Sequence, residues 1–177
     1  RLLRNQLIRT DLDLRYGQAV PVYSPPRELV DLLLRCPDSE TQRSAAHVED
    51  EEGRLPLHAA VATGTSSEVI QTLIQSYPTA LVHTTEETLQ TPLHTALASP
   101  FIAPLQNEAN ISMLLQAYVT SRHGTFVNGK LALKLEDSNG MYPLHHACQN
   151  QACLNVISTL VDRYPRACRF PNGNGDL

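Results

Sequence analysis

Three stretches of the chain place apolar residues three to four positions apart, which is the spacing of one buried stripe on a helix. Each stretch begins with a pair that includes isoleucine or valine, continues with a pair that includes leucine, and ends on a tyrosine. The stretches are 69–77, 111–118 and 156–164. This repetition predicts three amphipathic helices of one kind.

A shorter apolar segment opening on proline precedes each stretch. It reads Pro-Leu-His-x-Ala at 56–60, 92–96 and 143–147. Proline is tolerated at the first helical position, where the N–H has no helical partner. The pattern therefore predicts a short helix from Pro56 to Ala62, with Leu57, Ala60 and Val61 facing inward.

The residues around this short helix predict how each unit turns. We expect residues 64–67 to turn the chain and Ser67 to cap a second helix that runs to Tyr77. Pro78 stops that helix, because proline disfavours a helical conformation at the residue before it. Residues 79–89 then return the chain as a loop or short hairpin. An acidic residue lies six positions before each proline, at Asp50, Glu86 and Asp137.

One such helix pair cannot bury its own apolar face, so neighbouring pairs must stack. Each large side chain that is fully buried this way contributes roughly 1.5–3 kcal/mol. The sequence therefore predicts an all-α fold.

These residues resemble the ankyrin repeat, whose signature Thr-Pro-Leu-His-x-Ala is complete at 91–96. Gly53 and Gly140 match the hairpin glycine of that repeat, and Gly64 matches the turn between its helices. The resemblance implies an ankyrin-like solenoid of stacked helix-turn-helix repeats joined by hairpin loops. The structural signature residues are Pro56, Leu57, His58, Pro92, Leu93, His94, Pro143, Leu144 and His145.

Several positions depart from the ankyrin pattern. Leu55 and Tyr142 replace the signature threonine, so neither side chain can cap its helix. Leu89 occupies the hairpin-glycine position of the middle unit. The signature prolines Pro56, Pro92 and Pro143 are 36 and then 51 residues apart, so the middle unit contains about fifteen extra residues.

The repeat alignment divides the chain into two regions. Residues 1–47 form a degenerate N-terminal repeat or cap, in which 28–36 aligns with a second helix and 2–14 could form an amphipathic covering helix. Residues 48–177 hold three repeats, at about 50–85, 86–136 and 137–171, plus the start of a fourth at 174–177. Because the first residue is Arg1 rather than Met, we expect a fragment or a processed chain.

Composition and charge exclude several classes of protein. The formal net charge of −4 provides no basic field for phosphates, so general nucleic-acid binding is not expected. No apolar run is long enough to cross a membrane, and no signal peptide opens the sequence. The cysteines are Cys36, Cys148, Cys153 and Cys168, which are few and irregularly spaced. They indicate reduced thiols in an intracellular, cytoplasmic protein, with the nucleus left open.

The sequence offers no convincing catalytic or metal site. The resemblance gives the signature histidines a structural role, in which each ties its helix to the adjacent hairpin. His145, His146, Cys148 and Cys153 suggest zinc by composition, but their spacing fits no zinc finger and Cys148 falls on a position expected to be buried. Motifs for hydrolases, phosphate loops and dinucleotide binding are absent. We therefore expect no enzyme activity, cofactor or metal.

Two insertions distinguish the middle unit. The first, residues 99–108, lengthens the turn between its helices; its apolar Phe101, Ile102 and Leu105 either fold back over the stack, which we favour, or await a partner. The second, residues 119–139, contains Asn128-Gly129, a strong hairpin signal, between two short apolar runs that include Phe126. Such loops can recognise a partner or be neutral, and both alternatives stay open.

The resemblance implies binding of another protein through hairpin tips and the exposed sides of the first helices. A partner of the acidic tips would present a basic surface. The positions selected by the alignment are Glu51, Glu52, Arg54, Ala62, Thr63, Glu87, Thr88, Gln90, Ala98, Ser99, Ser138, Asn139, Met141, Gln149 and Asn150. Two alternatives are a targeting module of a larger enzyme or signalling protein, and a divergent repeat that only supports an assembly.

Overall fold

The described part of the chain is built from three pairs of α-helices. The computed structural model describes residues 45–99, 104–120, 126–127, 130–171, 173 and 175, together with Val30. The helices are α3 (Pro56–Thr63), α4 (Ser67–Ser76), α5 (Pro92–Ala98), α6 (Pro104–Thr120), α7 (Pro143–Gln149) and α8 (Leu154–Arg163). The all-α prediction is confirmed at this level.

Short elements connect these helices. Four 3-10 helices are described: η1 (Ala45–His47), η2 (Pro78–Val82), η3 (Ala132–Lys134) and η4 (Pro165–Arg169). Strands β1 (Phe126–Val127) and β2 (Lys130–Leu131) pair antiparallel, with Phe126 opposite Leu131 and Val127 opposite Lys130. This pairing confirms the hairpin predicted around residues 128–129.

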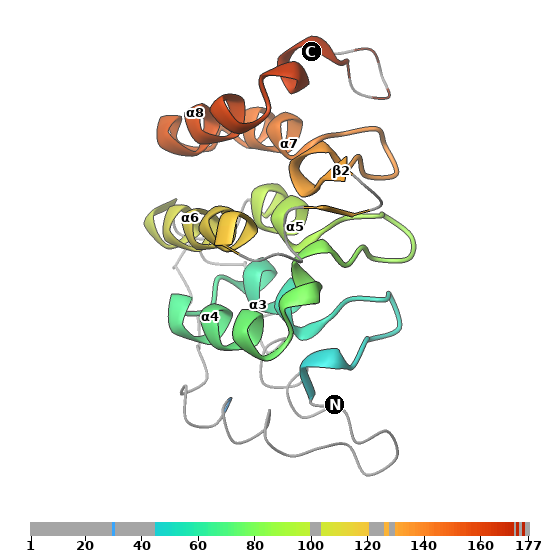
Figure 1. Cartoon of the computed structure of the whole chain (residues 1–177), viewed down its shortest axis with the longest axis vertical. Coiled ribbons are helices and arrows are strands. Elements are labelled where there is room, and N and C mark those ends of the chain that lie inside the picture. The colour runs from blue at the N-terminus through green and yellow to red at the C-terminus, as the bar shows by residue number, and fades with distance from the viewer. Residues whose placement is uncertain are drawn as a thin grey trace, which may run out of the picture.

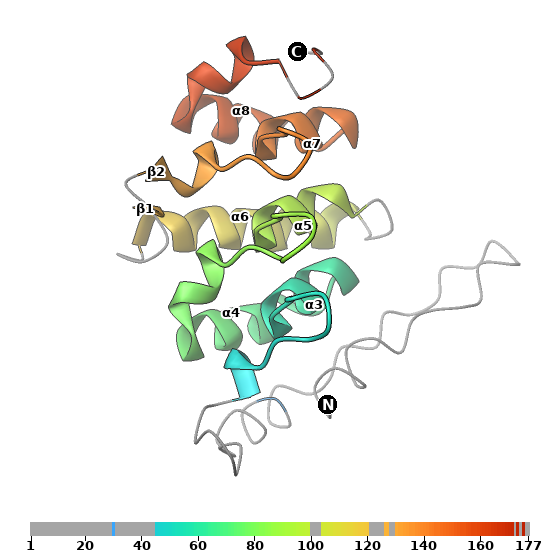
Figure 2. The ribbon, with the colours of Figure 1, turned by 90° about the vertical axis from the view of Figure 1, so that its right-hand side faces the viewer.

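The helix pairs stack in two rows (Figure 1). One row contains α3, α5 and α7, and the other contains α4, α6 and α8. Packing between successive pairs is continuous, since α3 packs on α5, α5 on α7, α4 on α6, and α6 on α8. The connecting turns project on the side of the first row, and they face the viewer in Figure 2.

The first helix of each pair begins as the sequence predicts. Leu55, Thr91 and Tyr142 are extended, and the proline that follows each of them opens the helix. Only Thr91 accepts a bond from its helix with its side chain. Leu55 and Tyr142 are buried and apolar instead, so they contribute packing where the signature threonine contributes a cap.

The second helix of the first unit differs from the prediction at both ends. Ser66, not Ser67, occupies the capping position, without a side-chain cap bond. The Ser67 hydroxyl instead donates to Asn110 Oδ1 (2.9 Å), which joins α4 to α6. The helix ends at Ser76, and Pro78 opens η2 where a loop or hairpin was expected, because proline suits the first turn of a 3-10 helix as well.

The insertions of the middle unit are partly helical, which corrects their predicted bounds. Helix α6 starts at Pro104, so residues 104–108 extend the helix and do not lengthen the turn. Leu105 therefore lies in α6, while Phe101 and Ile102 are outside the described residues. Residues 119 and 120 also belong to α6. Asn128 and Gly129 are not described, nor is the side chain of Phe126.

We call each helix pair a layer. The core lies between the two rows of helices and runs through all three layers. Its fully buried members come from the predicted stripes of both helix types, including Leu57, Ile70, Leu93, Ile111 and Leu114. Each first helix contributes a buried alanine as well, which allows the rows to approach closely. Val30 is helical and buried, and the other predictions for residues 1–44 fall outside the described residues.

Candidate functional site

Three turns project in register beside α3, α5 and α7, and we call them tips. Tip 1 spans residues 50–54, tip 2 spans 85–90 and tip 3 spans 137–141. A main-chain bond closes each tip between its first and last residue, with N–O distances of 3.0, 3.1 and 3.0 Å. Tip 2 is therefore one residue longer than the other two.

Polar side chains set the shape of the tips. Asp50 Oδ1 accepts from the amides of Glu52 and Arg54, both at 2.9 Å. Asp137 Oδ1 accepts in the same way from Asn139 (2.8 Å) and Met141 (2.9 Å). Two such bonds hold a short turn firmly, because a charged acceptor strengthens each of them.

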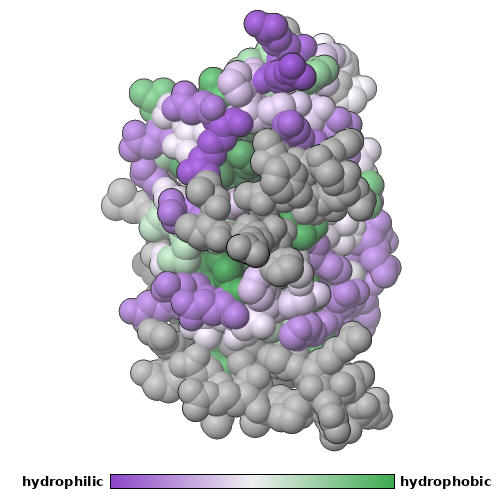
Figure 3. Space-filling view, viewed as in Figure 1, coloured by the Kyte–Doolittle hydropathy of each residue, from purple (hydrophilic) through white to green (hydrophobic). Residues whose placement is uncertain are grey.

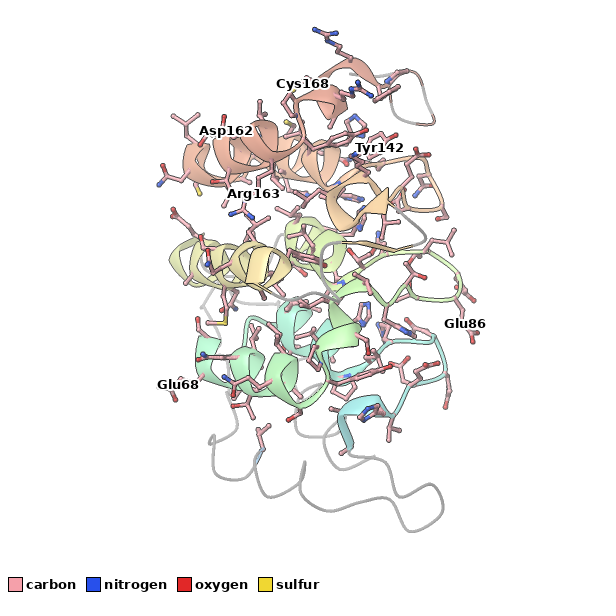
Figure 4. All side chains as sticks on the ribbon, in the orientation of Figure 1. Glu68, Glu86, Tyr142, Asp162, Arg163 and Cys168 are labelled. Atoms are coloured by element: carbon pink, nitrogen blue, oxygen red, sulfur yellow. The ribbon has the colours of Figure 1, made fainter. Side chains whose placement is uncertain are left out.

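In tip 2 a threonine takes the place of the aspartate. The Thr85 hydroxyl accepts from the Gln90 amide (3.1 Å). Glu86, which the sequence analysis aligned with the two aspartates, is exposed at the edge of the molecule (Figure 4). The alignment was wrong by one residue because it counted back from Pro92 and could not show that tip 2 is longer.

Main-chain bonds also join each tip to the next. The Glu86 amide donates to the Glu52 carbonyl (3.3 Å), and the Ser138 amide donates to the Thr88 carbonyl (2.9 Å). In the same way, the Gly173 amide donates to the Asn139 carbonyl (2.9 Å). The tips therefore form a ladder whose spacing is fixed by the backbone.

The signature histidines fix the start of each first helix. Each ring accepts at Nδ1 from the amide of the residue before the proline, at distances of 3.0–3.3 Å. Each Nε2 therefore carries the proton. His58 Nε2 donates to Gln90 O (3.3 Å) and His145 Nε2 to Phe170 O (2.9 Å), as the tie to an adjacent segment requires. His94 Nε2 is buried and has no partner within hydrogen-bond geometry among the described residues.

Burial keeps two of these histidines neutral. It lowers the pKa of His58 to about 4, with a further contribution from the neighbouring His83. Burial also lowers the pKa of His94 to about 4, and the nearby His146 adds to the effect. Both rings therefore stay uncharged near neutral pH.

Tip 3 is linked to α7 by a buried pair. His146 Nε2 lies 2.9 Å from Asp137 Oδ2, and both side chains are almost completely buried. The His146 ring meets the His94 ring edge to face, with centroids 5.6 Å apart. Burial raises the pKa of the Asp137 carboxyl, but its hydrogen bonds from Met141, His146 and Asn139 outweigh burial and leave the pKa lowered.

The predicted binding positions lie along the tips and the ends of the first helices, and none of the fifteen is buried. The tip residues Glu51, Glu52, Glu87, Thr88, Ser138 and Asn139 are exposed, and so are Gln149 and Asn150. The other seven, which are Arg54, Ala62, Thr63, Gln90, Ala98, Ser99 and Met141, are partly exposed.

Two of these positions also stabilise the stack, and a third stabilises its own tip. Ser99 Oγ donates to the Ala62 carbonyl (3.3 Å), and Asn150 Nδ2 donates to the Leu97 carbonyl (3.0 Å), so each links one first helix to the next. Arg54 is paired with Asp50 (3.0 Å) and with Glu52 (2.9 Å). A partner that used these side chains would have to compete with bonds inside the chain.

Tip 2 also exposes an apolar residue that the sequence analysis did not select. Leu89 of tip 2 is 45% exposed and has φ 51°, in the left-handed region. Gly53 and Gly140 occupy the same place in the other tips with φ 69° and 68°. The missing glycine at position 89 was visible in the sequence, and it was the signal for an apolar side chain at this tip.

The cysteine and histidine cluster of the third unit is dispersed. His145 and His146 point to Phe170 O and Asp137, and Cys148 is exposed, which contradicts the buried position predicted for it. Its equivalents are covered by the next layer, whereas Cys148 lies on the last described layer. Among the described residues no group of three or more His, Cys, Asp or Glu side chains could hold a metal ion.

Two further findings bear on the class of protein. In the part of the chain that the structure describes, every helix is too short or too polar to span a bilayer. The described cysteines Cys148, Cys153 and Cys168 are not in disulfides. Comparison of the chain with protein-family models and with curated proteins finds no match.

Proposed function

We propose that the chain is an ankyrin-type repeat scaffold that binds another protein and performs no chemistry. The observation that carries the proposal is the ladder of three tips beside the row of first helices. The ladder supports a continuous strip of exposed side chains on a backbone that is fixed from tip to tip. Loops on a rigid scaffold suit recognition, because little order has to be gained on binding.

The charge of the strip supports a basic partner surface at its first two tips. Glu51, Glu52 and Glu87 are exposed there, and Glu86 lies beside Glu52 through the main-chain bond between the tips. Arg54 balances only part of this charge, since it is already paired with Asp50 and Glu52. Complementary charge of this kind raises association rates and selects among partners.

The proposal is tested by affinity capture from a cell extract, with captured proteins quantified by mass spectrometry. We expect wild type to enrich a reproducible set of proteins, and Glu51→Lys/Glu52→Lys together with Glu87→Lys to lose most of that set. Glu68→Lys is the matched control, because Glu68 is an exposed glutamate on α4, on the side away from the tips (Figure 4). It should capture the same proteins as wild type.

Two results would contradict the proposal. Capture of no reproducible protein by wild type would indicate a supporting role without a binding partner. Equal capture by the tip variants and by Glu68→Lys would exclude the acidic tips as the binding surface.

A further inference from the structure

Leu89 of tip 2 has an apolar side chain on a backbone conformation that suits glycine. Its φ is 51°, and the equivalent residues of tips 1 and 3, Gly53 and Gly140, have φ 69° and 68°. Glycine adopts this conformation without strain because it has no Cβ, whereas a leucine is strained there. Leu89 is 45% exposed, so much of its apolar surface lies in water.

The backbone on either side of Leu89 is held by bonds to other parts of the stack. Before it, the Thr88 carbonyl accepts from the Ser138 amide of tip 3 (2.9 Å). After it, the Gln90 carbonyl accepts from His58 Nε2 of α3 (3.3 Å). The place of Leu89 between tip 3 and α3 is therefore set before any partner arrives, and little backbone order has to be gained on binding.

Exposure alone would not single out Leu89, because isolated apolar side chains are common on protein surfaces. The combination with backbone strain does single it out, since strained residues gather at sites that contact ligands. A glycine at this position would relieve the strain, so the leucine lowers the stability of the free chain. A contact that the side chain makes only in a complex would offset this loss.

The surroundings of Leu89 divide the strip of exposed side chains into two parts. Toward tip 1 the strip is acidic, because Glu86 and Glu87 are exposed and the Glu86 amide bonds to the carbonyl of the exposed Glu52 (3.3 Å). Figure 3 shows hydrophilic side chains along the edge of the molecule at which tips 1 and 2 project. The exposed side chains of tip 3 carry no charge. Leu89 therefore lies where an acidic surface meets an uncharged one.

We infer that a partner protein places an apolar pocket over Leu89, with basic side chains bordering that pocket on the side of tip 1. The inference rests on the proposed function, and it adds an apolar contact to the charge complementarity given there. Removal of the exposed leucine surface from water is favourable, and the surrounding charges direct the partner to it. Tip 2 is the middle one of the three tips, and the contacts that contribute most affinity cluster near the centre of an interface.

A cross-linking experiment identifies the surface that meets Leu89. The full chain carries a photoreactive leucine analogue with a diazirine ring at position 89, and it is irradiated in the cell extract used for affinity capture. Mass spectrometry then locates the cross-linked residue of the partner. We expect an apolar residue with Lys or Arg side chains beside it in the partner's structure. The same analogue at Leu154, which is 80% exposed at the start of α8, is the control and should not label that surface.

Substitutions at position 89 separate binding from stability. The cross-linked protein is purified, and its affinity for each variant is measured by isothermal titration calorimetry. Leu89→Gly should weaken binding at least about tenfold, while its urea midpoint rises because the strain is relieved. Leu89→Met keeps an apolar side chain and should retain most of the affinity. Circular dichroism checks that each variant is folded.

Gln151→Gly is the matched control for strain. Gln151 is also exposed and has φ 53°, but it follows the end of α7 that is away from tip 3. Its replacement should raise the urea midpoint as Leu89→Gly does and should leave the affinity unchanged. A loss of affinity that is confined to position 89 would assign the effect to the leucine side chain.

Four outcomes would overturn the inference. These are the absence of a cross-link from position 89, a cross-linked surface that is polar or acidic, a cross-link to a second copy of the chain, and unchanged affinity of the folded Leu89→Gly variant. Binding that depends on Glu51 and Glu52 but not on Leu89 would retain the proposed function and exclude this inference. Capture that depends on none of the three would exclude both.

Discussion

Among the described residues, Leu89 and Gln151 adopt a left-handed backbone conformation without being glycine. Leu89 has φ 51° in tip 2, and Gln151 has φ 53° in the turn between α7 and α8. The equivalent positions in other units are glycines, with φ near 68° at Gly140 and Gly64. A side chain in this conformation costs roughly 1–2 kcal/mol, because its Cβ approaches the backbone carbonyl. Both side chains are exposed, so no packing offsets that cost.

Replacing these residues with glycine should stabilise the protein. Leu89→Gly and Gln151→Gly are each expected to raise the free energy of unfolding by about 0.5–1 kcal/mol, which is the relieved strain less the extra entropy of glycine in the unfolded chain. Urea unfolding followed by circular dichroism measures the change.

Alanine variants at the same positions separate backbone strain from side-chain effects. Leu89→Ala and Gln151→Ala keep the Cβ and should show little gain. Gly53→Ala should lose stability, because its new Cβ would lie 2.6 Å from Glu86 Cγ and φ there is 69°. Equal stability of the glycine and alanine variants would show that position 89 or 151 is not strained.

One side chain in each tip accepts backbone amides and so holds the turn. Of these three side chains, Asp137 of tip 3 is the most deeply buried. Asp137 accepts two amides of its own tip and also pairs with His146, with its side chain removed from solvent. Removing one partner of a buried, charged network leaves the other partners unsatisfied, which costs more than the net value of the bonds.

Asp137→Ala is therefore expected to lower the free energy of unfolding by about 3 kcal/mol. Ser138→Ala is the control in the same tip, because Ser138 is exposed, and it should change stability by less than about 0.5 kcal/mol. Thermal and urea unfolding of both variants tests this difference. Similar losses for the two variants would mean that Asp137 does not anchor the tip.

The helices could be predicted because proline, leucine, histidine and the apolar stripe recur at fixed offsets. The residue that holds tip 2 could not be predicted. Thr85 and Glu86 are adjacent, and the extra residue that shifts the alignment from one to the other is visible only in the backbone. Helix α6 was predicted too short, since residues 104–108 show no apolar stripe of their own. Exposure of Cys148 depends on which layer covers α7, and the local sequence does not contain that information.

The stack as a whole should be sensitive to acid. His58 and His94 lie buried between layers, and burial lowers the pKa of each to about 4. In the unfolded chain a histidine takes up its proton near pH 6.5. The unfolded state therefore binds more protons between pH 6.5 and 4, and stability falls as the pH falls through this window.

Each histidine is expected to remove up to about 3 kcal/mol between pH 6.5 and 4. His94→Gln should be less stable than wild type at pH 7, yet it should show a shallower loss on acidification, because the amide does not titrate. Thr95→Ala on the same helix is the control, since it changes no titratable group, and its pH slope should equal that of wild type. Urea unfolding at a series of pH values measures the slopes. An unchanged slope for His94→Gln would contradict this account.

Since the rungs that join neighbouring tips consist of amides and carbonyls, the residues Glu52, Glu86, Thr88 and Ser138 contribute to alignment without using their side chains. Mutations at these sites can therefore accumulate during evolution without shifting one layer against another. The exposed side chains of the tips, and with them the choice of partner, can then change while the spacing between the tips stays the same.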